Sequence, residues 1–135
     1  MQPSAGGLPR ELQHHIDSLT DSDAGVRFQA VAALVDSKNP EVREPILKLV
    51  KDPDVFVRRQ VFEGLRTFKH AASVEALLVG LSDPVEIVRH SAHQSLVALL
   101  GPKVVFDPNG SKEARGNAVR KWREYWDDNK KSFGS

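Results

Sequence analysis

Apolar side chains recur at helical spacing along this chain, in copies displaced by a constant number of residues. Val26, Ala30 and Leu34 lie on one helix face, and the same spacing returns 31 residues later and again after another 31. In full, the repeated positions are Val26, Ala30, Ala33 and Leu34, then Val57, Val61, Gly64 and Leu65, then Val88, Ala92, Ser95 and Leu96. Three copies at one offset, with no insertion between them, predict an internal repeat.

Each copy also predicts a second helix, because the register continues between the copies. Apolar positions in the intervening segments repeat at the same offset of 31 residues, as Ile46, Leu47 and Val50 do with Leu77, Leu78 and Leu81. We therefore expect second helices over residues 40–51 and 72–82, each joined to its first helix by a short turn as an antiparallel pair.

The repeated Asp-Pro steps predict where the first helices begin. Asp52 and Asp83 suit the N-cap position, where a side-chain oxygen accepts a backbone N–H, and each precedes a proline. Proline is favoured at the first helical position, because its fixed φ suits a helix and its missing N–H would have no partner there. Glu86 follows Asp83 by three residues, which predicts a capping box.

One position of the first helix holds a small residue in every copy. The residues are Ala33, Gly64 and Ser95. Small side chains let two helices approach closely, which explains a glycine inside a helix despite its cost of about 1 kcal/mol. We therefore expect neighbouring first helices to pack tightly at this position.

The copies share the motif Asp-Pro-Asp-x-x-Val-Arg-x-x-Ala-x-x-Ala-Leu. This motif resembles the HEAT repeat in its short bacterial form, including the HEAT repeats of phycobilin-lyase-like proteins. The resemblance covers residues 9–101. It implies an all-α fold, a right-handed α-solenoid of antiparallel helix pairs whose usual work is to hold other proteins. The copies depart from the motif at Val85, Val61 and Ser22, which replace the second Asp, the small Ala and the Pro.

The two ends of the repeat array differ. Residues 8–20 match only the second half of a unit, so this half-repeat either covers the apolar end of the array or marks a cut from a longer one. The predicted single domain spans 8–129, with units at 21–51, 52–82 and 83–102, a loop and capping helix at 103–129, and tails at 1–7 and 130–135. Trp122 and Trp126 lie in the apolar stripe of the capping helix, and we expect them to pack over the last unit.

Arginines occupy one position in successive units, as Arg27, Arg58 and Arg89. Spaced arginines suit the phosphates of a nucleic acid. In the HEAT family, however, each such arginine pairs with the cap Asp of a neighbouring repeat, and the resemblance implies this structural role here. The aspartates concerned are Asp21, Asp52 and Asp83. The formal net charge of only +1 also favours the structural role.

No catalytic constellation stands out, and no cofactor is expected. The chain has no Cys, no G-x-S-x-G motif and no Gly-rich phosphate loop. Glu86, His90 and His93 share a helix face, an arrangement that can bind zinc or iron. His93 aligns with Val31 and Phe62, however, so we interpret it as a packing residue. The His-Glu dipeptides of HEAT-type di-iron hydroxylases are absent.

A candidate partner site lies on the second helices, which line the concave side of HEAT folds. Val74 and Val79 stand where the preceding unit has Arg43 and Lys48. Two aliphatic residues in place of charges predict a contact site for another protein or peptide. The predicted partner-binding residues are Glu44, Lys48, Val74, Glu75 and Val79, with the two glutamates at the rim.

The leading hypothesis is therefore a non-catalytic protein–protein interaction module or scaffold, either a small adaptor or part of a larger polypeptide. Two alternatives stay open: a relative of the HEAT-type lyases that act on tetrapyrrole chromophores, and a HEAT-like nucleic-acid-binding protein. The near-neutral charge argues against the second. With no visible signal peptide and no apolar run near the roughly 18 residues of a membrane span, we expect no membrane partner and, by default, a cytoplasmic location.

Overall fold

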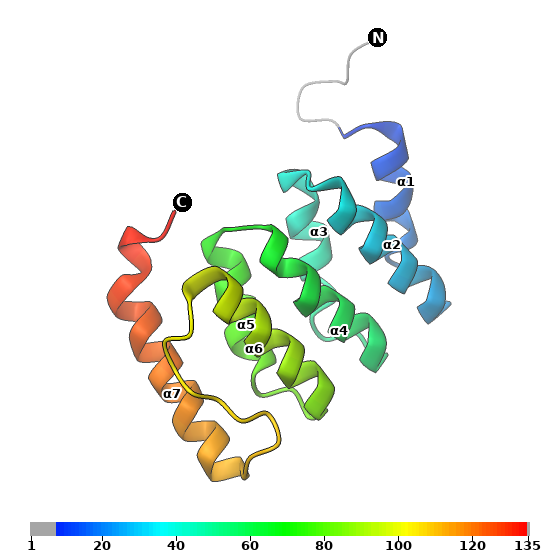
Figure 1. Ribbon diagram of the computed structural model, residues 1–135. Coiled ribbons are helices and arrows are strands. Elements are labelled where there is room, and N and C mark those ends of the chain that lie inside the picture. The colour runs from blue at the N-terminus through cyan, green and yellow to red at the C-terminus, as the bar shows by residue number, and fades with distance from the viewer. Residues whose placement is uncertain (1–7, 135) are drawn as a thin grey trace.

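The computed structural model describes residues 8–134, and within them the chain is helical with no strand. Seven α-helices follow one another, with short 3-10 turns at three places (Figure 1). The helices are α1 (Arg10–Ser18), α2 (Ala24–Ser37), α3 (Arg43–Leu47), α4 (Val55–Gly64), α5 (Ala71–Gly80), α6 (Glu86–Leu100) and α7 (Lys112–Asn129). The 3-10 turns are η1 (Pro40–Val42), η2 (Leu65–Thr67) and η3 (Lys130–Ser132).

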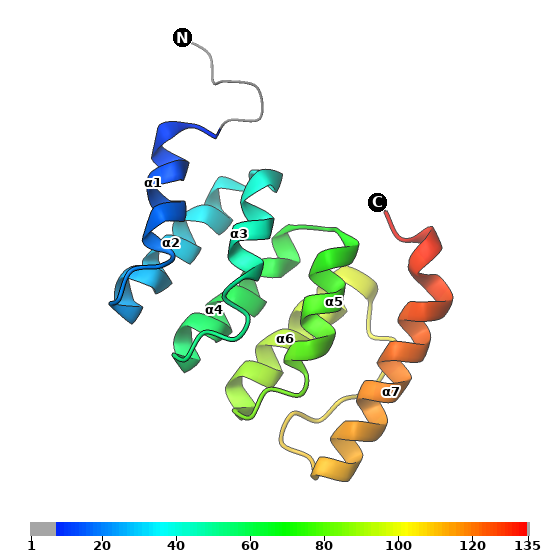
Figure 2. The ribbon, with the colours of Figure 1, turned by 180° about the vertical axis from the view of Figure 1, so that it is seen from behind.

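The helices stack in two layers, as an α-solenoid. The first layer contains α2, α4 and α6, and the second contains α1, α3, α5 and α7, which lie nearer the viewer in Figure 2. Within the first layer, α4 packs between α2 and α6. Helix α7 follows the loop after α6 and contacts both α5 and α6, so it stands where the third unit would have its second helix.

The first helices begin two residues later than predicted, so the N-cap assignment of Asp52 and Asp83 is wrong. Helix α4 starts at Val55, and its N-cap is Asp54, whose carboxylate accepts the backbone N–H groups of Phe56 and Val57. Asp52 is unavailable for this role because its carboxylate accepts hydrogen bonds from Arg27 of α2 as well as from the N–H of Asp54.

The capping box predicted for the third unit is also wrong. Glu86 is the first residue of α6, and the N-cap is Val85, whose side chain accepts no hydrogen bond. Val85 replaces the aspartate that caps the other two first helices, Asp23 and Asp54. Helix α6 therefore begins without a side-chain cap, and the carboxylate of Asp83 instead accepts the N–H of Val85 in the preceding turn.

The second helix predicted over residues 40–51 is split into η1 and the short α3. Pro45 explains the split, because it has no N–H to donate to the carbonyl four residues earlier. The chain tightens into a 3-10 turn instead, capped by Asn39. The helix predicted over 72–82 is the continuous α5, with the His70 side chain accepting the N–H of Ala72 at its start.

Neighbouring first helices approach closely at the small-residue position, as predicted. A Cβ atom added to Gly64 would lie 2.5 Å from Cγ2 of Val35 on α2. In the next unit, the hydroxyl of Ser95 donates a hydrogen bond of 2.7 Å to the carbonyl of Phe62 on α4. Only a small residue fits where the helix surfaces interlock in this way.

Helix α7 closes the C-terminal end of the core. Trp122 and Trp126 are almost fully buried, the first against His93 of α6. The indole N–H of Trp126 donates to Glu75 of α5 over 2.7 Å. Ser111 caps the helix by accepting the N–H of Ala114. The two tryptophans therefore cover the apolar faces of both helices that precede the loop.

Candidate protein-binding surface

The arginine row joins successive units and leaves little donor capacity for another ligand. Arg27 donates to both carboxylate oxygens of Asp52, over 2.8 and 3.0 Å, and also to the carbonyl of Asp21. Arg58 repeats this arrangement one unit later with the carboxylate of Asp83 and the carbonyl of Asp52. The hydrogen bonds to these carboxylates raise the pKa of both arginines above its ordinary value. Each bidentate pair fixes one unit against the next.

The last arginine meets a different partner, because the position 31 residues after Asp83 is Ala114. Arg89 donates through Nε to the carbonyl of Pro108 in the loop before α7, and through Nη1 to the carbonyl of Asp83. The loop thus supplies the acceptor that a following unit would provide. Arg89 is buried by this contact, so its charge is not presented to an external anion.

The structure contradicts the predicted role of Val74 in partner binding, because this side chain is 0% exposed. Its equivalents 31 residues apart are Leu12 and Arg43, and this position faces inward between the layers. The charge of Arg43 indicated that this position faces outward, but the Arg43 side chain is only 16% exposed. The buried row therefore carries one arginine among apolar residues.

Glu75 is not a free rim residue, which corrects the second part of the predicted site. Its carboxylate accepts Arg123 and the indole of Trp126, both over 2.7 Å. Partial burial raises the pKa of Glu75, but these two hydrogen bonds outweigh that effect and hold its pKa below the ordinary value. Glu75 therefore attaches α7 to α5.

The three remaining predicted residues lie on the surface of the second layer. Val79 is 51% exposed on α5, although it is a large aliphatic side chain. Lys48 stands at the equivalent position of the preceding unit and is exposed at the end of α3. Glu44 is exposed one helix turn before it and forms an ion pair with Arg43. Lys48 and Val79 thus form one outward row, running from unit to unit.

Two grooves flank this row, and part of their lining comes from equivalent positions of successive units. The first groove, of about 300 Å³, lies between α1 and α3 and is lined by Ile16, Leu19, Thr20, Pro45, Lys48 and Leu49. The second groove, of about 360 Å³, is lined in part by Val50, Lys51, Val79 and Gly80. These four residues are the equivalents, 31 residues on, of Leu19, Thr20, Lys48 and Leu49. The repeat therefore builds one wall of both grooves, and the second groove is completed by Arg58, Phe62, Ser82, Asp83 and Pro84.

Each groove carries one ammonium group that has no ion-pair partner within residues 8–134. Lys48 lines the first groove and Lys51 the second. The other charged groups of the second groove, Arg58 and Asp83, neutralise each other in a 2.8 Å ion pair. The first groove holds no other charged side chain. The surface is therefore apolar with a basic rim, which favours an acidic partner.

The histidines considered as metal ligands lie in different surroundings. His93 packs against Phe106 and Trp122, and burial lowers its pKa, whereas His90 is exposed on α6. In the part of the chain that the structure describes, no three His, Cys, Asp or Glu side chains gather to hold a metal ion. Within the same part, no helix combines the length and apolarity needed to cross a membrane.

The grooves were not predicted, because each is built by residues from two or more successive helices. A signal was nevertheless present, since Leu19 and Val50 are aligned apolar residues followed by the polar Thr20 and Lys51. The pair of positions at the end of each second helix repeats from unit to unit, and this pair lines both grooves.

Comparison with known proteins agrees with this architecture. The family model for HEAT repeats matches residues 12–97. A comparison with curated proteins returns no match. The matched segment runs from α1 into α6, and so contains both arginine–aspartate pairs and all lining residues of both grooves. With its 31-residue units, its two-layer stack of helix pairs and this match, the chain belongs to the HEAT repeat family.

Proposed function

We propose that this protein is a non-catalytic interaction module that binds an acidic, amphipathic helix of another protein across the two grooves of the second layer. HEAT repeats generally mediate protein–protein interaction or scaffolding, which supports the general role. The observation that carries the specific proposal is that two neighbouring grooves share apolar lining at equivalent positions and that each is lined by one unpaired lysine, Lys48 or Lys51. The two neighbouring grooves give the surface two anchor points instead of one.

The spacing of the grooves suits a helical ligand. Adjacent packed helices lie about 8–10 Å apart, so equivalent points in successive units are separated by roughly that distance. Residues seven positions apart on an α-helix are about 10.5 Å apart and lie on one face. Two leucines at that spacing fit one groove each, and carboxylates beside them reach Lys48 and Lys51.

A synthetic helical peptide tests this proposal. The probe has two leucines seven residues apart, flanked by glutamates, and a scrambled peptide of the same composition is its control. Fluorescence anisotropy should show binding of the probe and not of the scrambled peptide. Val79→Glu should weaken binding about tenfold or more, because it places a carboxylate in the second groove.

Matched variants separate the proposed surface from general charge effects. Lys48→Glu should weaken binding, while Lys121→Glu, the same charge reversal at an exposed position of α7, should leave it unchanged. Val105→Glu controls for Val79→Glu, because Val105 is 94% exposed on the loop before α7. Equal affinity for probe and scrambled peptide, or equal affinity of the Val79→Glu and Val105→Glu variants, would show the proposal to be wrong.

A further inference from the structure

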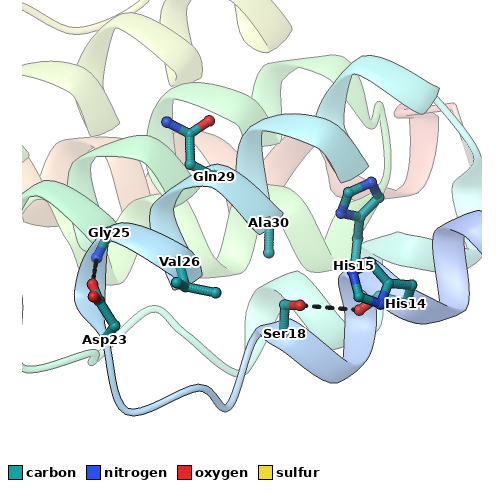
Figure 3. A pocket seen from close by; sticks show the side chains of 8 residues that line it. All are labelled: His14, His15, Ser18, Asp23, Gly25, Val26, Gln29 and Ala30. Atoms are coloured by element: carbon teal, nitrogen blue, oxygen red, sulfur yellow. Dashed lines mark hydrogen bonds between the residues drawn. The ribbon is translucent and has the colours of Figure 1, made fainter.

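The N-terminal end of the solenoid carries an open depression of about 510 Å³ between α1 and α2 (Figure 3). Val26 and Ala30 of α2 point toward the α1 side of this depression, where Ser18 lies. The surface is distinct from the grooves of the second layer, since none of its lining residues lines either groove. We call it the end depression.

Comparison with the other units shows what this surface lacks. Val26 is 38% exposed, whereas its equivalents Val57 and Val88 are 0% exposed. Val57 and Val88 belong to α4 and α6, which each pack against the first-layer helix of the preceding unit. Val26 has the same chemistry and the same place in its helix, and it lacks only that neighbour. The end depression is therefore the place of one more first-layer helix.

The aspartate that accepts an arginine at the junctions between units is also present at this end, as Asp21, whose carboxylate has no arginine partner in the described residues. The carboxylate of Asp21 accepts the N–H of Asp23 over 2.8 Å, the same turn that Asp52 makes with Asp54 over 2.9 Å. Asp52 additionally accepts Arg27, but within the described residues no guanidinium reaches the carboxylate of Asp21. The aspartate is thus held in the conformation that receives an arginine in the following units.

The α1 side of the end depression is polar, which makes the surface compatible with water when it is empty. His15 and Ser18 stand at positions where the next unit has the buried Ile46 and Leu49. A permanent helix stack would keep these positions apolar. A half-polar surface is what an interface needs if both partners are also stable apart.

A second copy of this chain cannot supply the missing helix in a head-to-tail stack. Its C-terminal arginine, Arg89, is buried and already bound to the carbonyl of Pro108. Helix α7 and its two buried tryptophans cover the same end. A head-to-tail copy is therefore excluded, and the half-polar α1 side favours a helix that docks from another protein.

We propose that the end depression binds an arginine-bearing helix of another protein, lying beside α2 as α2 lies beside α4. The guanidinium of that helix pairs with the carboxylate of Asp21, and its small or aliphatic side chains cover Val26 and Ala30. The pairs Arg27–Asp52 and Arg58–Asp83 are two examples of this junction within the chain itself. The interaction does not depend on the grooves of the second layer.

The test tethers a surrogate helix to the full chain. A copy of residues 23–38, which contains α2 and its cap, is fused through a flexible Gly/Ser linker to the N-terminus. If the copy docks, the melting temperature should rise by about 3 °C or more over the parent chain. Replacing Arg27→Ala in the added copy alone, or Asp21→Asn in the chain, should abolish the rise.

A disulfide reports the register of docking, because the natural chain has no cysteine. A Cβ on Gly64 would lie 3.4 Å from Cβ of Val35, close to the separation of about 3.8 Å found in disulfides. Ala33 is the equivalent of Gly64 in the first unit. Ala33→Cys should therefore cross-link to Val35→Cys of the added copy, whereas Ala98→Cys, at an exposed position of α6, should not.

Each outcome decides the proposal. A stabilisation that requires Asp21 and the arginine of the added copy, with selective cross-linking at Ala33, supports it. Asp36→Asn is the matched control for Asp21→Asn, because it removes another exposed carboxylate from the same unit and should preserve the rise. No rise, a rise that survives Asp21→Asn, or equal cross-linking at Ala33 and Ala98 overturns the proposal. None of these results bears on peptide binding at Lys48 and Val79.

Discussion

Equivalent residues in this protein have different physical roles when their neighbours differ. His93 stands 31 residues after the buried Phe62 and packs against two aromatic side chains, Phe106 and Trp122. Its Nε2 atom is buried and has no hydrogen-bond partner in the described part of the chain. Burial lowers the pKa of His93 from its ordinary value of 6.5, because the charged imidazolium is poorly solvated there.

The lowered pKa of His93 predicts a loss of stability in mild acid. As pH falls below about 6.5, the unfolded chain binds a proton at this histidine while the folded chain does not, so the free energy of unfolding decreases. His93→Phe, which copies the residue of the preceding unit, should reduce the fall in melting temperature between pH 7.5 and 5.5. The exposed His90→Phe variant is the control. An equal fall in the parent and in His93→Phe would contradict this account.

Helix packing is decided by small residues at particular contact points. A Cβ on Gly80, at the end of α5, would lie 2.8 Å from Cβ of Ala92 and 2.9 Å from the ring of Phe62. Gly116, inside α7, has no atom within 4 Å of the same added Cβ. Both glycines belong to helices, but only Gly80 is required by its neighbours.

Alanine substitutions at these two glycines should change stability in opposite directions. Gly80→Ala should lower the free energy of unfolding by about 1–3 kcal/mol, because the contact with Ala92 leaves little room to relax. Gly116→Ala should raise it by up to about 1 kcal/mol through helix propensity and lower entropy of the unfolded chain. Urea unfolding followed by circular dichroism measures both. Stabilisation by Gly80→Ala would show that α5 and α6 are less closely packed than described.

The two ends of the whole molecule are closed to different degrees. At the C-terminal end, α7 buries two tryptophans, and the loop occupies Arg89. At the N-terminal end, α1 has no buried residue within its helix, and Asp21 and Val26 stay exposed. Stability in a repeat stack is approximately a sum over units and their interfaces, so a helix with one interface missing opens most easily.

Amide hydrogen exchange should show this asymmetry. Amides of α1 should exchange on the order of tenfold faster than those of α7, although both are terminal helices, because only α7 is held by buried aromatic side chains. Amides of α4, which packs between two neighbours, should exchange most slowly. Equal protection of α1 and α7, measured by mass spectrometry of matched peptides, would contradict the difference between the ends.

The repeat could be predicted from the sequence because the buried residues at equivalent positions of successive units pack in the same way against the neighbouring helices. The helix pairs, the close approach at Gly64 and Ser95, and the HEAT family followed from residues 31 positions apart. The candidate partner site was predicted only in part. Lys48 and Val79 lie outward, but Val74 faces inward. The prediction for Val74 failed because Arg43, its charged equivalent, is itself largely buried.

Periodicity by itself determined which residues share an environment; the tertiary structure decided what each environment is. Whether Asp52 caps a helix or receives an arginine depends on the neighbouring unit, which presents Arg27 to it. The grooves likewise depend on successive helices lying side by side, and the open N-terminal end depends on a neighbour that α2 lacks. A repeat specifies its positions locally, whereas burial, pairing and exposure arise only when the units are stacked.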